Sequence, residues 1–201
     1  MIPTELLVSA YASGWFPMAV GESDIRWFSP DPRGIIPLDG FRIPSRLARV
    51  VRGGRFRIEV NRAFGAVMRA CASSARGAEE GGTWIDDEIL ESYEALHRLG
   101  LAHSVETWQG DALVGGLYGV SLRGAFFGES MFHTATDASK VALVALVERL
   151  RALEYRLLDI QWVTEHLSQF GAVEIPKREY LVRLDSALGL ERRFTDPVPQ
   201  A

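Results

Sequence analysis

The chain has 201 residues, of which 47% are hydrophobic, and a formal net charge of −4. This length and composition predict one medium-sized domain with a core of its own, with or without a small appendage. They exclude a membrane-spanning chain, because no apolar run reaches the roughly 18–20 residues that a bilayer span needs.

The N-terminus and the rarer side chains indicate the compartment. No basic segment followed by an apolar one opens the sequence, so we expect no signal peptide. Cys71 is the only cysteine, which excludes an internal disulfide and fits a reducing environment. The four histidines do not cluster with cysteines or carboxylates at metal-ligand spacing, so we expect no metal site. We therefore expect a cytoplasmic protein.

The first predicted element is a short helix over residues 3–13 that ends at Gly14. Aromatic residues interrupted by prolines and glycines follow and predict a rigid, irregular region up to Gly34. We place a boundary there, which gives a small N-terminal domain over residues 1–34 and a larger domain over residues 35–201.

An arginine-rich segment comes next. Six arginines and no acidic residue lie between positions 42 and 57, and residues 44–52 are predicted to form a helix. Arg42, Arg46 and Arg49 are spaced four and three apart, so they share a face or its edge. A local basic stripe can bind phosphate within an acidic protein, because salt screens charges beyond about 8–10 Å. The pattern leaves a phosphate-binding face and a merely solvated face both open.

Strands and helices then alternate. The first four predicted elements are a strand over 56–60, a helix capped by Asn61 and ending near Ser73, a loop over 75–82 and a helix over 86–99. Three successive strands follow over 102–108, 112–120 and 124–132. The remaining elements are a helix over 138–153, a strand over 156–163, a short helix over 165–170 and a last strand or helix over 180–184.

This order predicts an α+β fold with a mixed sheet. The strand over 124–132, the helix over 138–153 and the strand over 156–163 form one right-handed strand–helix–strand unit. Active sites tend to lie at the carboxyl ends of such strands and at the start of the intervening helix.

Two polar residues in an apolar strand are the first candidate for chemistry. Asp159 and Gln161 are two residues apart, so they point to the same face of the strand. A buried carboxylate needs donors or a charge partner, and a structural network would meet that need. The functional interpretation is a pair in which Asp159 polarises Gln161, whose side-chain carbonyl accepts a proton from an amine. Both interpretations stay open here.

Glu129 and the start of the long helix are further candidates. Glu129 lies between aromatic residues and is either a structural carboxylate or a receptor for a cation. The neighbouring Ser130 resembles a nucleophile elbow only superficially, because the second glycine is missing. Asp137 is a candidate N-cap, and Lys140 falls in the first helical turn, where the dipole disfavours a cation unless an anion such as phosphate binds there too. A solvated lysine is the alternative.

Together these segments resemble the leucyl/phenylalanyl-tRNA–protein transferase family. The matching strings follow the family's order over essentially the whole chain: Ala10-Tyr11 with Phe16-Pro17, WFSPDPRG at 27–34, GTWI at 82–85, YEALHRLGLAHSVETW at 93–108, LVGGLYGV at 113–120, FFGESMF at 126–132, ASK at 138–140, LLDIQ at 157–161, HL at 166–167 and FGAVEIPKREYL at 170–181. Two positions depart from the family pattern: Met18 stands where some members have tryptophan, and Ile160 stands between Asp159 and Gln161 where cysteine is usual.

The resemblance implies a fold and a reaction. The fold is a small N-terminal domain beside a catalytic domain similar to the GNAT-type N-acetyltransferases. The reaction transfers leucine, phenylalanine or methionine from aminoacyl-tRNA to the N-terminal α-amine of proteins that begin with arginine or lysine. This transfer marks those proteins for N-end-rule degradation, and it implies a monomeric enzyme that needs no cofactor.

The resemblance also implies residue roles. Asp159 and Gln161 would be catalytic, and Glu129 would bind the basic end of the acceptor. The side-chain pocket for the transferred amino acid would be lined by Leu117, Phe126, Met131, Leu143, Leu146 and Leu158. Trp84 would lie near the terminal adenosine, and Ser139 and Lys140 would hold a tRNA phosphate. With the basic helix, the tRNA-binding residues would be Trp84, Arg42, Arg46, Arg49, Ser139 and Lys140.

Two rival functions need to be separated from this one. A coenzyme A-dependent N-acetyltransferase would need a glycine-rich pyrophosphate loop before the long helix, and residues 132–137 contain no glycine. A non-catalytic tRNA-binding protein would not need Asp159, Gln161 and Glu129 together.

Overall fold

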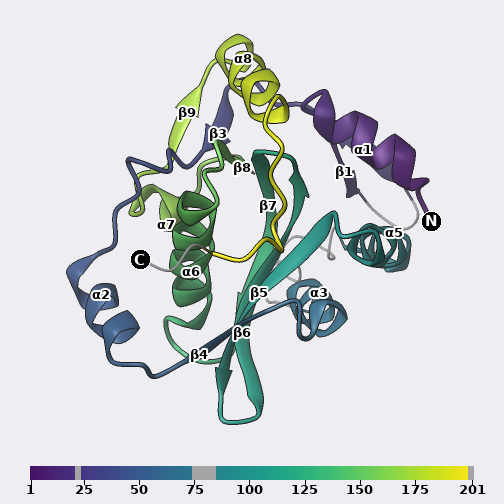
Figure 1. Ribbon diagram of the computed structural model, residues 1–201. Helices are drawn as coiled ribbons and strands as arrows, with labels where there is room; N and C mark the ends of the chain where they lie inside the picture. The colour runs from purple at the N-terminus through teal and green to yellow at the C-terminus, as the bar shows by residue number, and fades with distance from the viewer. Residues whose placement is uncertain (21–23, 74–84, 199–201) are drawn as a thin grey trace.

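The structure is a computed structural model that describes residues 1–20, 24–73 and 85–198. A seven-stranded mixed sheet forms its centre (Figure 1). In sheet order the strands are β4 (Arg57–Val60), β5 (Ala102–Gln109), β6 (Ala112–Leu122), β7 (Ala125–His133), β8 (Leu157–Gln161), β3 (Arg33–Ile35) and β9 (Val173–Ile175). All neighbours are antiparallel except β7 and β8, which are parallel. The predicted α+β fold with a mixed sheet is confirmed.

Helices cover both faces of the sheet, so side chains of successive strand residues enter two apolar layers. One layer packs beneath α1 (Thr4–Ala12), α3 (Phe64–Ala72), α5 (Asp87–Arg98) and α8 (Lys177–Leu188). The other packs beneath α2 (Ser45–Arg52) and α6 (Ala138–Ala152), with the single-turn helix α7 (Glu165–Ser168) near the end of β8. In Figure 1, α6 lies on one side of the sheet and α3 and α5 lie on the other.

The predicted strand–helix–strand unit is β7, α6 and β8. The two parallel strands pair only as far as Phe127 opposite Asp159, although β7 continues to His133. The register of β7 against β6 also shifts here: Gly119 pairs with Gly128 and Tyr118 pairs with Ser130, which leaves Glu129 as the extra residue of a bulge. The carboxyl ends of β7 and β8 therefore part beside Glu129.

The N-terminal segment contains strands that the sequence did not predict. β1 (Phe16–Ala19) and β2 (Ile25–Phe28) form a two-stranded antiparallel sheet, and β3 lies inside the main sheet between β8 and β9. These strands have three or four residues, and prolines interrupt the region, so no alternating pattern could develop. Gly34 is the middle residue of β3, where the backbone of Trp162 leaves no room for a Cβ atom. The division into domains at this residue stays a prediction.

One predicted helix cap is wrong, and the other residue occupies the N-cap position without a side-chain capping bond. Asn61 does not cap the following helix, which begins at Phe64; with a φ of 60°, Asn61 instead accepts a hydrogen bond from the Ser104 amide and contacts His103. Asp137 precedes α6 but has a φ of 69° and makes no side-chain capping bond. Both residues adopt the left-handed conformation that asparagine and aspartate tolerate, which turns the side chain away from the capping position.

The C-terminal part is mostly as expected. Residues 180–184 fall within α8, which settles the choice between strand and helix. The predicted loop over 75–82 lies outside the described residues. Among the helices that the structure describes, none has the length and apolar character needed to cross a bilayer.

Candidate active site

The carboxylate of Asp159 is buried and fully bonded. Its Oδ1 accepts hydrogen bonds from Arg33 Nε and from the backbone amide of Gln161, both at 2.9 Å. Its Oδ2 accepts from Arg33 Nη2 at 2.6 Å and from the Tyr180 hydroxyl at 2.7 Å. A carboxylate offers about four lone-pair sites, and four donors occupy them. Asp159 is thus a fixed ion-pair partner without free capacity for a substrate proton.

Arg33 carries the matching positive charge. Its side chain is 1% exposed and lies over the rings of Phe16 and Tyr180. Burial opposes the charge, but the neighbouring carboxylate of Asp159 outweighs it and raises the pKa of Arg33 above the ordinary value. Burial and the charge of Asp159 likewise raise the pKa of Tyr180, which keeps its hydroxyl protonated as a donor.

Gln161 ends β8 in an unusual backbone conformation. Its φ is 59°, and its backbone amide is fixed by Asp159 Oδ1. The side-chain amide reaches across the gap between β8 and β7, where Nε2 donates to Glu129 Oε1 at 3.3 Å. No described residue donates a hydrogen bond to Gln161 Oε1. That oxygen is therefore the acceptor which this arrangement leaves for a substrate N–H group.

Glu129 is the second carboxylate of the site and lacks a cation of its own. It is partly buried in the bulge of β7 and accepts hydrogen bonds from Gln161 and, at 2.8 Å, from the Tyr11 hydroxyl. Burial raises the pKa of Glu129 to about 8, and the charge of Asp159 adds to this, while the bond from Tyr11 and the charge of Arg33 lower it. Among the described residues no lysine or arginine forms an ion pair with Glu129. A cationic ligand would complete its environment.

Tyrosine hydroxyls surround Glu129 on its inner side. Tyr11 bonds to both Glu129 and the hydroxyl of Tyr93, and the Tyr93 ring packs edge-on against Tyr118. Burial, with the charge of Glu129 next, raises the pKa of all three tyrosines, so they remain neutral. The Tyr118 hydroxyl is buried and has no partner among the described residues. These groups can donate hydrogen bonds and cannot supply positive charge.

The structure brings together the three residues predicted for chemistry but changes how they connect. The functional interpretation needed Asp159 to contact the side chain of Gln161, and it does not. Asp159 instead accepts a hydrogen bond from the backbone amide of Gln161, and the Gln161 side chain donates to Glu129. The described contacts therefore give Asp159 no direct bond with which to polarise the side-chain amide of Gln161, and the catalytic role of the pair stays a prediction. The left-handed backbone of Gln161, which a simple strand pattern does not predict, causes the difference.

Sequence reasoning missed the supporting residues. These are Arg33, Tyr180, Tyr11 and Tyr93, all of which lie within the strings that carry the family resemblance. One physical signal was available: a carboxylate inside an apolar strand requires a buried donor or cation. It did not identify the partner, because Arg33 lies 126 residues from Asp159 in the sequence.

The predicted amino-acid pocket lies on the α6 side of the sheet. Five of its six residues are at most 3% exposed and belong to one apolar cluster: Leu117, Phe126, Leu143, Leu146 and Leu158. Met131 is only partly buried and packs against that cluster on β7, two residues from Glu129. The structure thus groups these residues as one layer, and their role as a pocket stays a prediction.

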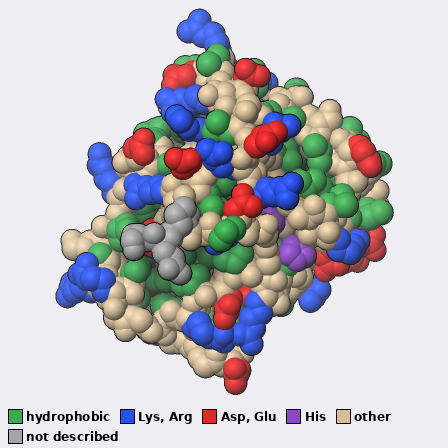
Figure 2. All heavy atoms as spheres, in the orientation of Figure 1, with side chains coloured by type: hydrophobic (Ala, Val, Ile, Leu, Met, Phe, Trp, Pro, Cys, Tyr) green, Lys and Arg blue, Asp and Glu red, His purple; other side chains and the backbone are tan. Residues whose placement is uncertain are grey.

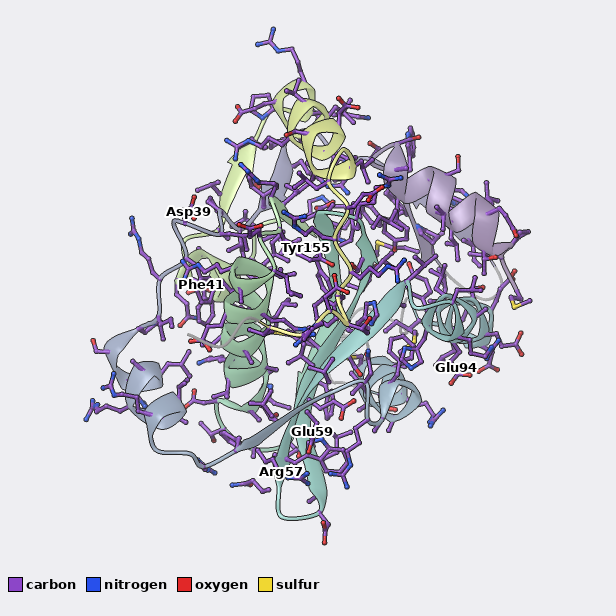
Figure 3. All side chains as sticks on the ribbon, viewed as in Figure 1. Asp39, Phe41, Arg57, Glu59, Glu94 and Tyr155 are labelled. Atoms are coloured by element: carbon purple, nitrogen blue, oxygen red, sulfur yellow. The ribbon has the colours of Figure 1, made fainter. Side chains whose placement is uncertain are left out.

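The predicted tRNA contacts on and beside α2 are exposed. Arg42, Arg46 and Arg49 lie at the protein surface, and none forms an ion pair within the part of the chain that the structure describes. Figure 2 shows basic side chains over the position that α2 occupies in Figure 1. The arginine of the next strand differs, because Arg57 pairs with Glu59 on β4 (Figure 3). The charges of Arg42, Arg46 and Arg49 are therefore available to a ligand on and beside α2.

The start of α6 fits a phosphate less well than predicted. Ser139 is 2% exposed and its hydroxyl faces His133 at 3.4 Å. Lys140 is partly exposed and pairs with Asp137 at 3.4 Å. This internal partner explains how a cation is tolerated in the first helical turn without a bound anion. Trp84 lies outside the described residues.

No three described histidine, cysteine, aspartate or glutamate side chains are placed to hold a metal ion together. A second buried carboxylate, Glu106, accepts hydrogen bonds from Ser104, Trp108 and the backbone amide of Ala63.

The family profiles and the named relatives that match this chain agree with each other. The family profile described as "Leucyl/phenylalanyl-tRNA protein transferase" matches residues 35–185, and the profile described as its N-terminal domain matches residues 1–31. A Phenylobacterium zucineum protein named "Leucyl/phenylalanyl-tRNA--protein transferase" is 58% identical over 190 residues, which cover 94% of this chain and 85% of that protein. A protein of the same name from Caulobacter vibrioides is 56% identical over 190 residues, with coverage of 94% and 87%. Among solved structures, "The structure of L-PGS from Bacillus licheniformis" has a TM-score of 0.46 and 12% identity and covers 92% of this chain and 70% of that one.

Proposed function

The chain belongs to the leucyl/phenylalanyl-tRNA–protein transferase family, and from this premise we propose the substrates and the residue roles of an aminoacyltransferase. The donor is leucyl-, phenylalanyl- or methionyl-tRNA. The acceptor is the N-terminal α-amine of a protein that begins with arginine or lysine. The product carries one additional N-terminal residue, which marks it for N-end-rule degradation in the cytoplasm. The enzyme acts as a monomer.

The reaction is the aminolysis of an activated ester. The acceptor amine nitrogen attacks the ester carbonyl, a C–N bond forms, and the C–O bond to the tRNA 3′ ribose breaks. The proton lost from nitrogen ultimately balances the ribose hydroxyl that leaves. Because the ester is already activated, holding the two substrates in contact supplies much of the acceleration.

Glu129 receives the cationic end of the acceptor. Its carboxylate has neutral donors on its inner side, no cation among the described residues, and a partly exposed position where β7 and β8 part. This is the observation that carries the proposal, because an arginine or lysine side chain supplies the charge that the site lacks. A charge-assisted contact of this kind is about twice as strong as a neutral hydrogen bond.

Gln161 orients the attacking amine. Its Oε1 is available and lies on the residue that bonds to Glu129, so one acceptor can meet both groups. As the attack proceeds, the N–H groups of the amine become more acidic, and a fixed carbonyl oxygen stabilises them. Asp159 contributes indirectly, through the backbone of Gln161.

The donor occupies the other side of β7. We infer that the six-residue apolar layer around Met131 and Phe126 opens to take the side chain of the transferred amino acid. Such a pocket would separate leucine, phenylalanine and methionine only weakly, since one methylene is worth about 1–3 kcal/mol. The arginines of α2 contact tRNA phosphates, as their exposure and free charges support.

A transfer assay with mass detection tests this function. Purified protein is incubated with phenylalanyl-tRNA and a peptide that begins with arginine. We expect the peptide mass to rise by one phenylalanine residue, and RNase added beforehand to prevent the rise. Transfer from acetyl-coenzyme A to the same peptide, with none from tRNA, would instead establish the rival acetyltransferase function.

A further inference from the structure

Arg33 makes more directed contacts than an ion pair requires. Besides the two bonds to Asp159, its Nη1 donates to the backbone carbonyl of Gly14 at 2.9 Å. Gly14 lies just beyond Ser13, the C-cap of α1; it has a φ of 78° and donates its amide to the carbonyl of Tyr11 at 3.0 Å. The planar guanidinium therefore fixes two separate segments relative to each other.

These contacts close a ring that passes through the reaction site. From Arg33 the ring runs through Asp159 to the Gln161 backbone, and then through the Gln161 side chain to Glu129. Tyr11 donates to the same oxygen of Glu129, and the chain from Tyr11 to Gly14 returns to Arg33. Arg33 itself is 1% exposed, so it lies behind the site and cannot meet a substrate.

We propose that Arg33 is a positioning residue for aminoacyl transfer, acting through Asp159 to hold Gln161 in the left-handed conformation that presents its side-chain oxygen to the acceptor amine. This inference rests on the proposed function. Tyr180 assists, because its hydroxyl occupies the remaining lone pair of Asp159 Oδ2 and stops the carboxylate from rotating. The orientation of the Asp159 carboxylate fixes the backbone of Gln161, because the Gln161 amide donates a hydrogen bond to Oδ1.

A structural role alone would not predict the same kinetics. If Arg33 only stabilises the fold, a variant that is still folded should retain its turnover number. If Arg33 positions Gln161, a folded variant should transfer slowly while binding tRNA normally, because the exposed arginines of α2 take no part in the ring of contacts and remain intact. The turnover number and the tRNA affinity therefore separate the two roles.

The primary variant is Arg33→Lys, which keeps the charge but loses the planar fork and its simultaneous bond to Gly14. Its matched control is Arg151→Lys. Arg151 also directs Nε and Nη2 of its guanidinium at one partner, the backbone carbonyl of Leu38, at the far end of α6. We expect kcat of Arg33→Lys to fall by roughly tenfold or more, with an unchanged Kd for tRNA, and kcat of Arg151→Lys to equal that of the wild type.

A second pair of variants, with smaller structural changes, keeps the proposal testable if Arg33→Lys does not fold. Tyr180→Phe removes one donor from Asp159 and preserves the ring over which Arg33 lies. Tyr155→Phe removes an equally short bond, the one between the hydroxyls of Tyr155 and Ser121 at 2.7 Å, outside the ring of contacts. We expect kcat to fall about threefold or more in Tyr180→Phe and to stay at the wild-type value in Tyr155→Phe.

A double variant shows whether Arg33 acts through Asp159. In an Asp159→Asn background, Arg33→Lys should lower kcat much less than it does in the wild type, because the connection to Gln161 is already broken. Full additivity of the two effects on kcat in folded proteins would overturn the inference.

The wild-type rate distinguishes this inference from the function on which it rests. A wild-type protein that transfers no amino acid overturns both. An active wild type overturns only the inference if folded Arg33→Lys has a kcat within twofold of it, or, when that variant does not fold, if Tyr180→Phe and Tyr155→Phe have the same kcat.

Discussion

The environment of the Glu129 side chain favours its protonated, neutral form as long as no cation is bound beside it. Its pKa of about 8 lies above the ordinary value of 4.5, chiefly because of burial. The free protein therefore holds this proton near neutral pH, and a bound arginine or lysine favours its release. If Glu129 binds the acceptor as we propose, recognition of the acceptor and the charge state of Glu129 are coupled.

This coupling predicts a pH-dependent stability. Between about pH 4.5 and pH 8 the folded chain binds more protons at Glu129 than the unfolded chain, so stability falls as pH rises through that window. Glu129→Gln cannot titrate. We expect its free energy of unfolding, relative to wild type, to improve between pH 5 and pH 8 by on the order of a few kcal/mol. Urea unfolding at both pH values measures this, and parallel changes in the two proteins would contradict it.

Asp159 differs from Glu129 because its charge is already compensated. Asp159→Asn leaves Arg33 as a buried cation with a neutral partner, which costs on the order of 3–5 kcal/mol of stability. In the fraction that folds, we expect kcat to fall by roughly 10²-fold while tRNA affinity stays the same, because Gln161 loses the contact that positions it. Circular dichroism defines the folded fraction and single-turnover transfer gives the rate. A folded variant with near-normal kcat would remove Asp159 and the backbone of Gln161 from catalysis.

At the scale of single elements, strand ends create the site. β7 and β8 begin as paired parallel strands and part after Phe127 and Asp159, and the bulge at Glu129 directs a charged residue toward the gap. Tyr11 of helix α1 donates a hydrogen bond to Glu129, and Arg33 of β3 donates one to Asp159. Four elements therefore contribute polar groups to the site: two come from β8 and one each from β7, α1 and β3.

The basic face of α2 gives a prediction for tRNA. Reversing Arg46 and Arg49 to glutamate should weaken tRNA binding and reduce the slope of log K against log salt by about one to two units, since each phosphate contact contributes nearly one. The matched control reverses Arg98 and Arg178, which are exposed on α5 and α8 and cause the same change in net charge. Equal effects of the two double variants would show that α2 acts only through overall charge.

Sequence reasoning succeeded where elements are long and regular. The three strands β5 to β7 and the helix α6 were predicted nearly to the residue, because alternation and a sustained apolar face extend over 8 to 15 residues. It failed for β1, β2, β3 and β9, which have three or four residues and owe their strand conformation to pairing with distant segments. Such pairing is a property of the tertiary fold and leaves no local period.

At the scale of the whole molecule, dependence on tertiary contacts also limits how much of the site the sequence could predict. Asp159, Gln161 and Glu129 could be singled out because polar residues stand out in apolar strands. Their connections could not, since Tyr11 is 118 residues from Glu129 and Tyr180 is 21 residues from Asp159. Nor does a strand pattern predict the backbone turn that separates the Gln161 side chain from Asp159.

The whole enzyme should depend on RNA and be indifferent to metal chelation. The chemistry proposed for it uses an ester that is already activated, and the histidines do not cluster at metal-ligand spacing in the sequence. We expect transfer to be abolished by RNase and unchanged by EDTA, measured with purified charged tRNA and a buffer in which the tRNA stays folded. Loss of transfer in EDTA that zinc restores would contradict this expectation.

Discrimination between a charged and a neutral acceptor tests the central claim most directly, which is that the uncompensated carboxylate of Glu129 selects the acceptor of aminoacyl transfer. The measurement compares kcat/KM for two peptides that differ only in their first residue, arginine or its neutral isostere citrulline, with phenylalanyl-tRNA as donor. We expect wild type to favour the arginine peptide by roughly 10–100-fold, corresponding to about 1.5–3 kcal/mol for a hydrogen bond to a charged group, chiefly through KM. Glu129→Gln should lose most of this preference. A wild type that transfers phenylalanine equally well to both peptides, or a Glu129→Gln variant that keeps the full preference, would contradict the account.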